Sequence, residues 1–87
     1  MDKTFSALRD GRGVTYVKPL ETPRRAHPYQ QAIATHVVVW FNHNTRDWVV
    51  SLGDATGMQY GNSQYCGFKE WATDEANDLV NGTTDTL

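Results

Sequence analysis

One stretch, HVVVWFNHNTRDWVVSL at residues 36–52, constrains what this chain can fold into more than any other part of it. Runs rich in valine and aromatic residues favour β-strands. The polar HNTR between the two runs is typical of a four-residue hairpin loop. The sequence therefore predicts two antiparallel strands, residues 37–42 and 47–52. In this register Phe41 lies opposite Trp48.

Both faces of this hairpin carry large apolar side chains, because side chains alternate across the pleat of a strand. One face is wholly apolar and holds Val37, Val39, Phe41, Trp48, Val50 and Leu52. On the other face, Trp40 and Val49 lie opposite each other, with Val38 beside them. One helix covers only one face of a small sheet. The second face therefore needs either a partner or a cover from the chain's own Phe5, Leu8 and Leu20.

The segments before and after the hairpin are less regular. Alternation in GVTYVK predicts a strand at residues 13–18. Pro19, Pro23 and Pro28 then predict a long loop, because proline lacks an amide donor. Residues 1–10 are expected to form a short helical turn, and residues 58–65 either a third hairpin strand or a loop.

A single helix is predicted from Phe68 to Val80, because its apolar residues recur at helical spacing. Those residues are Phe68, Trp71, Ala72, Ala76, Leu79 and Val80. Asn81-Gly82 is a typical C-terminal stop. Phe68, Trp71 and Leu79 are expected to pack the helix on the Phe41–Trp48 face.

The predicted fold class is α+β: a small antiparallel sheet of three to four strands with one C-terminal helix packed on one face. Eighty-seven residues are enough for one small domain. We expect this domain to span residues 1–82, followed by a flexible tail at 83–87.

Charge is unevenly distributed along the chain. Residues 1–46 carry a net charge of +4 and residues 47–87 a net charge of −6. The sequence has no apolar run long enough to span a membrane and no secretory signal, and its one cysteine cannot form an internal disulfide. These features favour a cytoplasmic protein without a membrane partner. No cofactor or metal motif is present: the spacing of Cys66, His27, His36 and His43 fits no standard zinc site.

The main functional hypothesis is a non-enzymatic protein-binding module. Its predicted contact residues are Val38, Trp40 and Val49 on the second sheet face and Asp74, Glu75 and Asp78 on the helix. A row of carboxylates can imitate nucleic-acid phosphates and occupy a basic groove. In size and charge the chain resembles the small accessory proteins of phages and plasmids. The resemblance implies an inhibitor of a host enzyme or defence complex, of the anti-restriction or anti-CRISPR type. A homodimer through a sheet face or edge is a further option.

The alternative hypothesis is a nucleic-acid-binding protein. Its predicted contacts form a basic stripe of Arg9, Arg12, Lys18, Arg24 and Arg25. Tyr16, Tyr29 or Trp40 would stack on bases. The acidic helix and the acidic isoelectric point weigh against this hypothesis.

Overall fold

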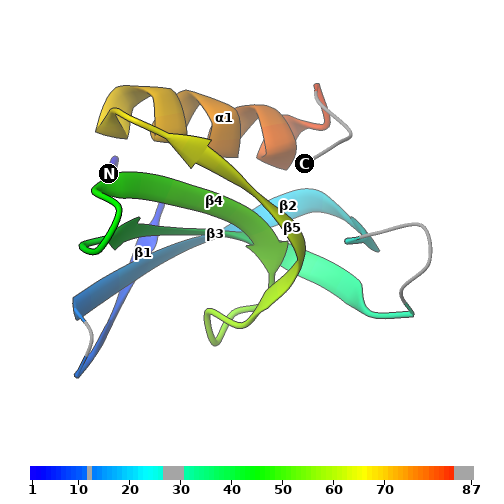
Figure 1. Ribbon diagram of the computed structural model, residues 1–87. Helices are drawn as coiled ribbons and strands as arrows, with labels where there is room; N and C mark the ends of the chain where they lie inside the picture. The colour runs from blue at the N-terminus through cyan, green and yellow to red at the C-terminus, as the bar shows by residue number, and fades with distance from the viewer. Residues whose placement is uncertain (12, 27–30, 84–87) are drawn as a thin grey trace.

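The computed structural model describes residues 1–11, 13–26 and 31–83. Within them the chain forms five strands, β1 (Ser6–Asp10), β2 (Gly13–Arg25), β3 (Ile33–Asn42), β4 (Asp47–Gly53) and β5 (Gln59–Cys66), and then α1 (Lys69–Asn81). The strands form one antiparallel sheet in chain order, and α1 lies across one of its faces (Figure 1). The predicted α+β class is confirmed, with five strands in place of three to four.

The central hairpin has the predicted register. Phe41 pairs with Trp48, and Val39 pairs with Val50. The turn is closed by the amide of Arg46, which donates to the carbonyl of Asn42 at 2.7 Å. The pattern of alternation was therefore sufficient to place every side chain of this hairpin on its correct face.

Two predictions at the edges of the sheet are changed by the structure. Residues 6–10 form strand β1 instead of a helical turn, because they pair along their whole length with β2, from Ser6–Val17 to Asp10–Gly13. Residues 59–66 form β5, which settles the choice between strand and loop. A five-residue segment gains little from isolated helix formation, whereas a neighbouring strand supplies partners for its backbone.

The predicted loop at residues 19–28 is also wrong over most of its length. Strand β2 continues through Pro19 and Pro23 to Arg25. Its pairing with β1 ends at Val17, and its register with β3 shifts between Pro19 and Arg24. The prolines therefore lie where one edge of β2 has no partner strand and the ladder is interrupted, so a missing amide donor costs little. Pro28 and Tyr29 lie outside the described residues.

The main core lies between the sheet and α1. It contains twelve buried residues: Phe5, Leu20, Ala34, Val37, Val39, Val50, Leu52, Cys66, Ala72, Ala76, Leu79 and Val80. The buried stripe of α1 is narrow, and two alanines let the helix approach the sheet closely. The helix ends at Gly82, which has a φ of 73°, as the Asn81-Gly82 pair predicted.

Phe68 and Trp71 do not belong to this core, so their predicted packing against Phe41 and Trp48 is wrong. Phe68 is the extended N-cap residue and Trp71 is on the outer side of α1; they are 58% and 60% exposed. The apolar positions of the helix were more numerous than the sheet could cover. The stripe of Ala72, Ala76 and Leu79 faces the sheet because small residues allow the closer approach.

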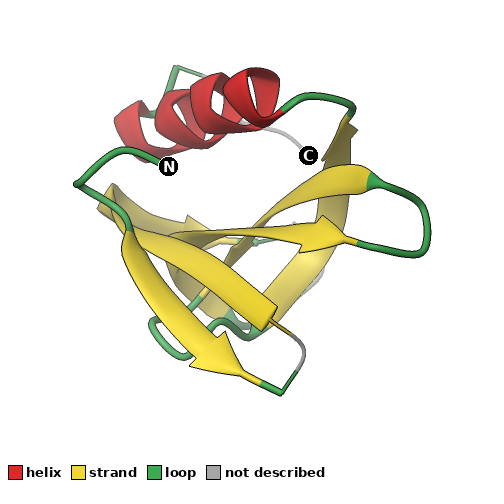
Figure 2. Cartoon of the chain, turned by 90° about the vertical axis from the view of Figure 1, so that its left-hand side faces the viewer, coloured by secondary structure: helices red, strands yellow, loops and turns green. Residues whose placement is uncertain are grey.

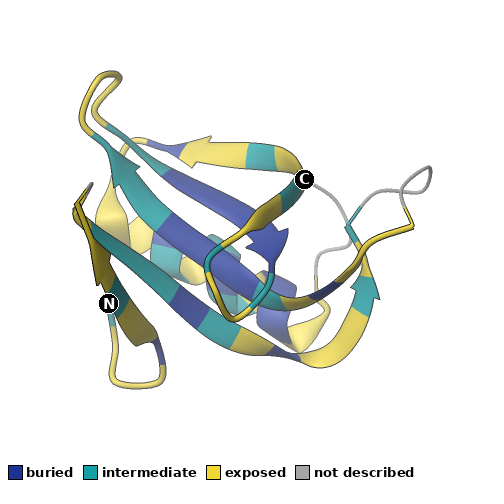
Figure 3. Cartoon of the chain, turned by 90° about the horizontal axis from the view of Figure 1, so that it is seen from below, coloured by how far each residue is buried: buried dark blue, intermediate teal, exposed yellow. Residues whose placement is uncertain are grey.

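The second sheet face is covered by the chain itself, and of the three residues predicted to cover it only Leu8 lies on that side. Phe5 and Leu20 pack on the helix side. The sheet is bent, as Figure 2 shows. Figure 3, which views the molecule from below, shows that the residues in the middle of the sheet are buried. The β4–β5 turn reaches β1 and β2, and an ideal Cβ on Gly57 would lie 3.4 Å from Leu8 Cδ1. Bending and this turn together enclose Val38 and Val49.

Asp54 organises the β4–β5 turn. Its Oδ1 accepts from the backbone amide of Thr56 at 2.9 Å and from the Thr56 hydroxyl at 2.5 Å. Its Oδ2 accepts from the Tyr60 hydroxyl at 2.5 Å. The hydrogen bonds from Thr56 and then from Tyr60 lower the pKa of Asp54 to about 2.

The Asp54 bonds should make stability dependent on pH. The pKa is lower in the folded chain than its ordinary value of 3.8, so the contribution is complete above pH 3.8 and is lost as pH falls towards 2. We expect Asp54→Asn to lower the free energy of unfolding by about 1 kcal/mol at pH 6, and the difference to shrink below pH 4. Urea unfolding of the wild-type and Asp54→Asn proteins across this pH range measures the difference in their free energies of unfolding. Parallel pH curves for the two proteins would contradict the role given to Asp54.

Candidate functional site

The exposed surface of α1 carries a stripe that combines aromatic and acidic side chains. Asp74, Glu75 and Asp78 are three, four and seven residues after Trp71, so the four residues share one side of the helix. Asp74 and Asp78 are exposed, and Glu75 is half-buried. With Phe68, these residues form what we call the outer stripe. The structure thus brings together all three predicted acidic residues and adds two aromatic ones.

The two aromatic side chains of the outer stripe support each other. The rings of Phe68 and Trp71 pack edge to face, with centroids 4.7 Å apart and an interplanar angle of 81°. Beside them, Lys69 Nζ lies 5.9 Å from the centroid of the Trp48 ring. The Phe68–Trp71 pair forms an exposed apolar surface at the start of the helix. Aromatic residues of this kind carry a large share of the binding energy at protein interfaces.

The three contact residues predicted on the second sheet face have different environments. Val38 is fully buried and Val49 is 2% exposed, so neither side chain reaches the surface of the folded chain. Trp40 is half-buried. Its Nε1 is buried and has no hydrogen-bond partner among the described residues. The exposed part of the indole is therefore carbon.

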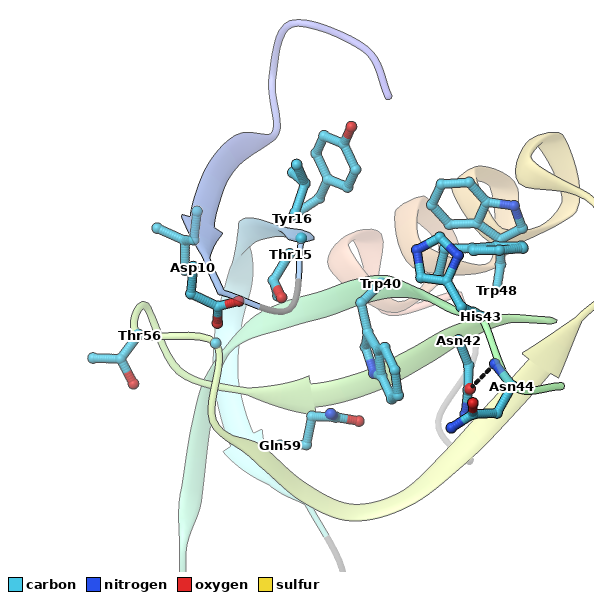
Figure 4. A pocket seen from close by; sticks show the side chains of 15 residues that line it. Asp10, Thr15, Tyr16, Trp40, Asn42, His43, Asn44, Trp48, Thr56 and Gln59 are labelled. Atoms are coloured by element: carbon cyan, nitrogen blue, oxygen red, sulfur yellow. Dashed lines mark hydrogen bonds between the residues drawn. The ribbon is translucent and has the colours of Figure 1, made fainter. Parts of the chain in front are cut away.

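Trp40 lines an open cleft of about 620 Å³. The cleft is bounded by the end of the β1–β2 hairpin, the β3–β4 turn and the start of β5 (Figure 4). Its polar lining consists mainly of amides and hydroxyls, and the residues that matter here are Asp10, Thr15, Asn42, Asn44, Thr56 and Gln59. Trp48 and Tyr16 contribute further aromatic surface. Among the described lining residues, Asp10 is the only Asp, Glu, Lys or Arg.

The predicted basic residues do not form one stripe. Arg9 pairs with Val14 at one end of β2, whereas Arg24 and Arg25 lie at the other end of that strand. Lys18 faces α1, where its Nζ donates to Asn77 Oδ1 at 2.8 Å. Arg12 lies outside the described residues. The nucleic-acid hypothesis in its original form therefore lacks a continuous basic surface across the part of the chain that the structure describes.

Cys66 is buried beneath the start of α1. Burial, followed by the negative charges of Glu75 and Asp47, raises the pKa of its thiol. This shift disfavours the thiolate, the form that acts as nucleophile or metal ligand. Over residues 1–11, 13–26 and 31–83, no three His, Cys, Asp or Glu side chains are grouped so that they could hold a metal ion. The described helix is not long and apolar enough to cross a membrane.

Comparison with known proteins adds no functional information. No protein family, no curated protein and no solved structure matches the chain. Functional inference therefore depends on the two surfaces described above, the outer stripe and the Trp40 cleft.

Sequence reasoning missed the exposure of Phe68 and Trp71. A signal was nevertheless present, since Trp71 is spaced three, four and seven residues from Asp74, Glu75 and Asp78. An aromatic residue in register with a row of acids belongs to the outer side of an amphipathic helix. The predicted apolar stripe was too wide because apolar character alone was used to define it.

Proposed function

We propose that this chain is a non-enzymatic protein-binding module that docks through the outer stripe of α1 onto a basic surface of its partner. The observation that carries the proposal is the Phe68–Trp71 pair, two large aromatic side chains that pack on each other and stay more than half exposed. Exposed aromatic residues with no role in the core are typical of an interaction site.

The carboxylates beside the pair determine the kind of partner. Asp74 and Asp78 are exposed one helical turn apart, and α1 has no basic residue in its last turn to balance them. A basic partner surface would be attracted to this row, and long-range attraction of this kind accelerates association. Basic grooves are common in proteins that handle nucleic acids. The specific form of the proposal is therefore an inhibitor of a host enzyme or defence complex, of the anti-restriction or anti-CRISPR type, carried by a phage or plasmid.

Capture from native host lysate tests this function. We expect the wild-type chain to retain a protein at about 50 mM salt and to lose most of it at about 300 mM, because exposed charges are screened. Asp74→Lys combined with Asp78→Lys should abolish retention, and Trp71→Ala should reduce it at least about tenfold.

A matched control is Glu21→Lys, which reverses an exposed charge on β2 that lies beside the C-terminal end of α1 and is not part of the outer stripe. It should leave retention unchanged. Retention that is equal in all four proteins, or that survives high salt and the Trp71 change, would contradict docking through α1.

A further inference from the structure

The cleft beside Trp40 contains an aromatic surface whose position is set by strand pairing. Trp40 lies directly opposite Thr15 of β2 and Val49 of β4, so these three side chains share one face of the sheet. This is the face that α1 does not cover, because Trp40 alternates with Val39, which belongs to the core under the helix. The indole is half-buried and its Nε1 is buried, so a ligand in the cleft meets the carbon atoms of the ring.

The other aromatic strand residues of the lining do not share this face. Strand pairing places them on the helix face, opposite or in line with Val39; they are Tyr16, Phe41 and Trp48. Trp40 alone therefore supplies a stacking surface on the face opposite α1.

Two amide side chains of the cleft have their oxygens held by the protein. Gln59 Oε1 accepts from the hydroxyl of Ser51 at 2.8 Å, and Asn42 Oδ1 accepts from the backbone amide of Asn44 at 3.0 Å. Ser51 is fully buried, which fixes the end of the Gln59 side chain against the sheet. In each amide the NH₂ group is the part not engaged in that bond, and it can donate to a ligand.

The polar groups lie around the indole and carry little charge. Figure 4 shows Gln59 below the indole, Asn42 on one side of it and Thr56 on the other. The Thr56 hydroxyl donates to Asp54, so its oxygen can accept from a ligand. The described lining residues include one carboxylate, that of Asp10, and no lysine or arginine that would bind an anionic group.

A neutral sugar ring matches this combination of groups. A pyranose with equatorial hydroxyls has C–H groups on its flat faces and hydroxyls around its perimeter. The C–H hydrogens suit the negative face of an indole. Each hydroxyl can both accept from an amide NH₂ and donate to an oxygen. The cleft volume of about 620 Å³ is in the range of small-molecule sites.

We propose that this cleft binds a neutral β-linked oligosaccharide, one ring of which stacks on Trp40. The NH₂ groups of Gln59 and Asn42 donate to its hydroxyls, and the oxygens of Thr56 and Asp10 accept from them. The site is separate from the outer stripe, because α1 contributes no residue to it. Sugar binding here is independent of the protein binding proposed above.

The test uses the indole N–H signals of the ¹⁵N-labelled full chain, which has three tryptophans. Single Trp→Phe variants assign the three signals. The probes are cellotriose, xylotriose and tri-N-acetylchitotriose, which are neutral, β-linked and equatorial. At least one of them should move the Trp40 signal in a saturable manner, with a Kd of about 1 mM or below, and leave the Trp71 signal in place.

Matched variants separate stacking from hydrogen bonding. Trp40→Leu should lower affinity for the trisaccharide about tenfold, whereas Trp71→Leu, which changes an indole outside the cleft, should not alter it. Gln59→Glu keeps an oxygen for the Ser51 hydroxyl but replaces the NH₂ donor, so affinity should fall about fivefold. Gln64→Glu makes the same charge change at an exposed position of β5 outside the lining and should have no effect. Amide spectra show whether each variant keeps the fold, and if Trp40→Leu does not, the two glutamine variants decide.

Three outcomes would overturn the proposal. They are an unchanged Trp40 signal with all three trisaccharides at about 5 mM, undiminished binding by a folded Trp40→Leu protein, and equal effects of Gln59→Glu and Gln64→Glu. A Trp40 signal that responds to tetramethylammonium or to oligothymidylate, but to no trisaccharide, would assign the cleft to a cationic or anionic ligand and would also overturn it. None of these outcomes bears on protein binding through α1, which the Trp71 and Asp74 variants test independently.

Discussion

Gly53→Ala is expected to lower the free energy of unfolding by about 3 kcal/mol, which is a large share of the stability of a domain this small. Gly53 is the last residue of β4 and is buried against β3 and the following turn. An ideal Cβ at this position would lie 1.9 Å from the carbonyl oxygen of Met58 and 2.8 Å from Val38 Cγ2. The first neighbour is backbone and cannot rotate away.

The consequence of this clash extends beyond the turn. The Met58 carbonyl accepts from the amide of Asp54 at 3.1 Å, so moving it disturbs the bonds that shape the turn. The β4–β5 turn helps to cover Val38 and lies beside the Trp40 cleft. Gly53→Ala should therefore also broaden or shift the NMR signal of the Trp40 indole N–H.

Chemical denaturation of the Gly53→Ala protein, with Gly67→Ala as the control, measures the change in the free energy of unfolding. Gly67 is exposed, and a Cβ there would have no neighbour within 4 Å. The control should stay within about 0.5 kcal/mol of wild type. A Gly53→Ala protein as stable as the control would show that the turn does not pack against β3 as described.

Leu79→Ala is expected to destabilise the chain by about 3 kcal/mol, while Trp71→Ala should cost less than about 0.5 kcal/mol. Leu79 is 1% exposed and is the largest fully buried side chain of α1. Removing it leaves a cavity between helix and sheet. Trp71 is larger, but it is 60% exposed and loses little packing when truncated.

This pair of variants distinguishes two ways of attaching the helix. If Phe68 and Trp71 anchored α1 together with Leu79, as sequence periodicity predicted, truncating Trp71 would cost at least as much stability as truncating Leu79. Thermal unfolding followed by circular dichroism is sufficient, because an effect of this size moves the midpoint by several degrees in a small domain. A larger loss in Trp71→Ala than in Leu79→Ala would contradict the described helix packing and remove the basis for the outer stripe.

The acidic character of the outer stripe on α1 reflects the charge asymmetry of the chain. The acidic outer stripe belongs to the C-terminal half of the chain. Sequence alone showed the two charge blocks, +4 and −6. It could not show that Lys18 turns towards α1 or that Arg9 and Arg24 lie near opposite ends of β2, because these arrangements depend on which strands pair and how far they bend.

Local patterning determined the central hairpin, its register and the end of the helix. Alternating side chains in β3 and β4 allow only one pairing that buries both valine rows, and Gly82 adopts the left-handed conformation that stops α1. The predicted acidic row on the helix surface followed from the same periodic reasoning.

Tertiary structure alone decided how the second apolar face is covered. A short segment such as β1 and a proline-containing strand such as β2 have no strong preference of their own, and they become strands because neighbouring strands satisfy their backbone groups. The resulting five-stranded sheet bends until Val38 and Val49 are enclosed, while Trp40 stays partly open and Trp71 is left outside. Burial of this kind depends on contacts between residues far apart in the chain, and local sequence carries no measure of them.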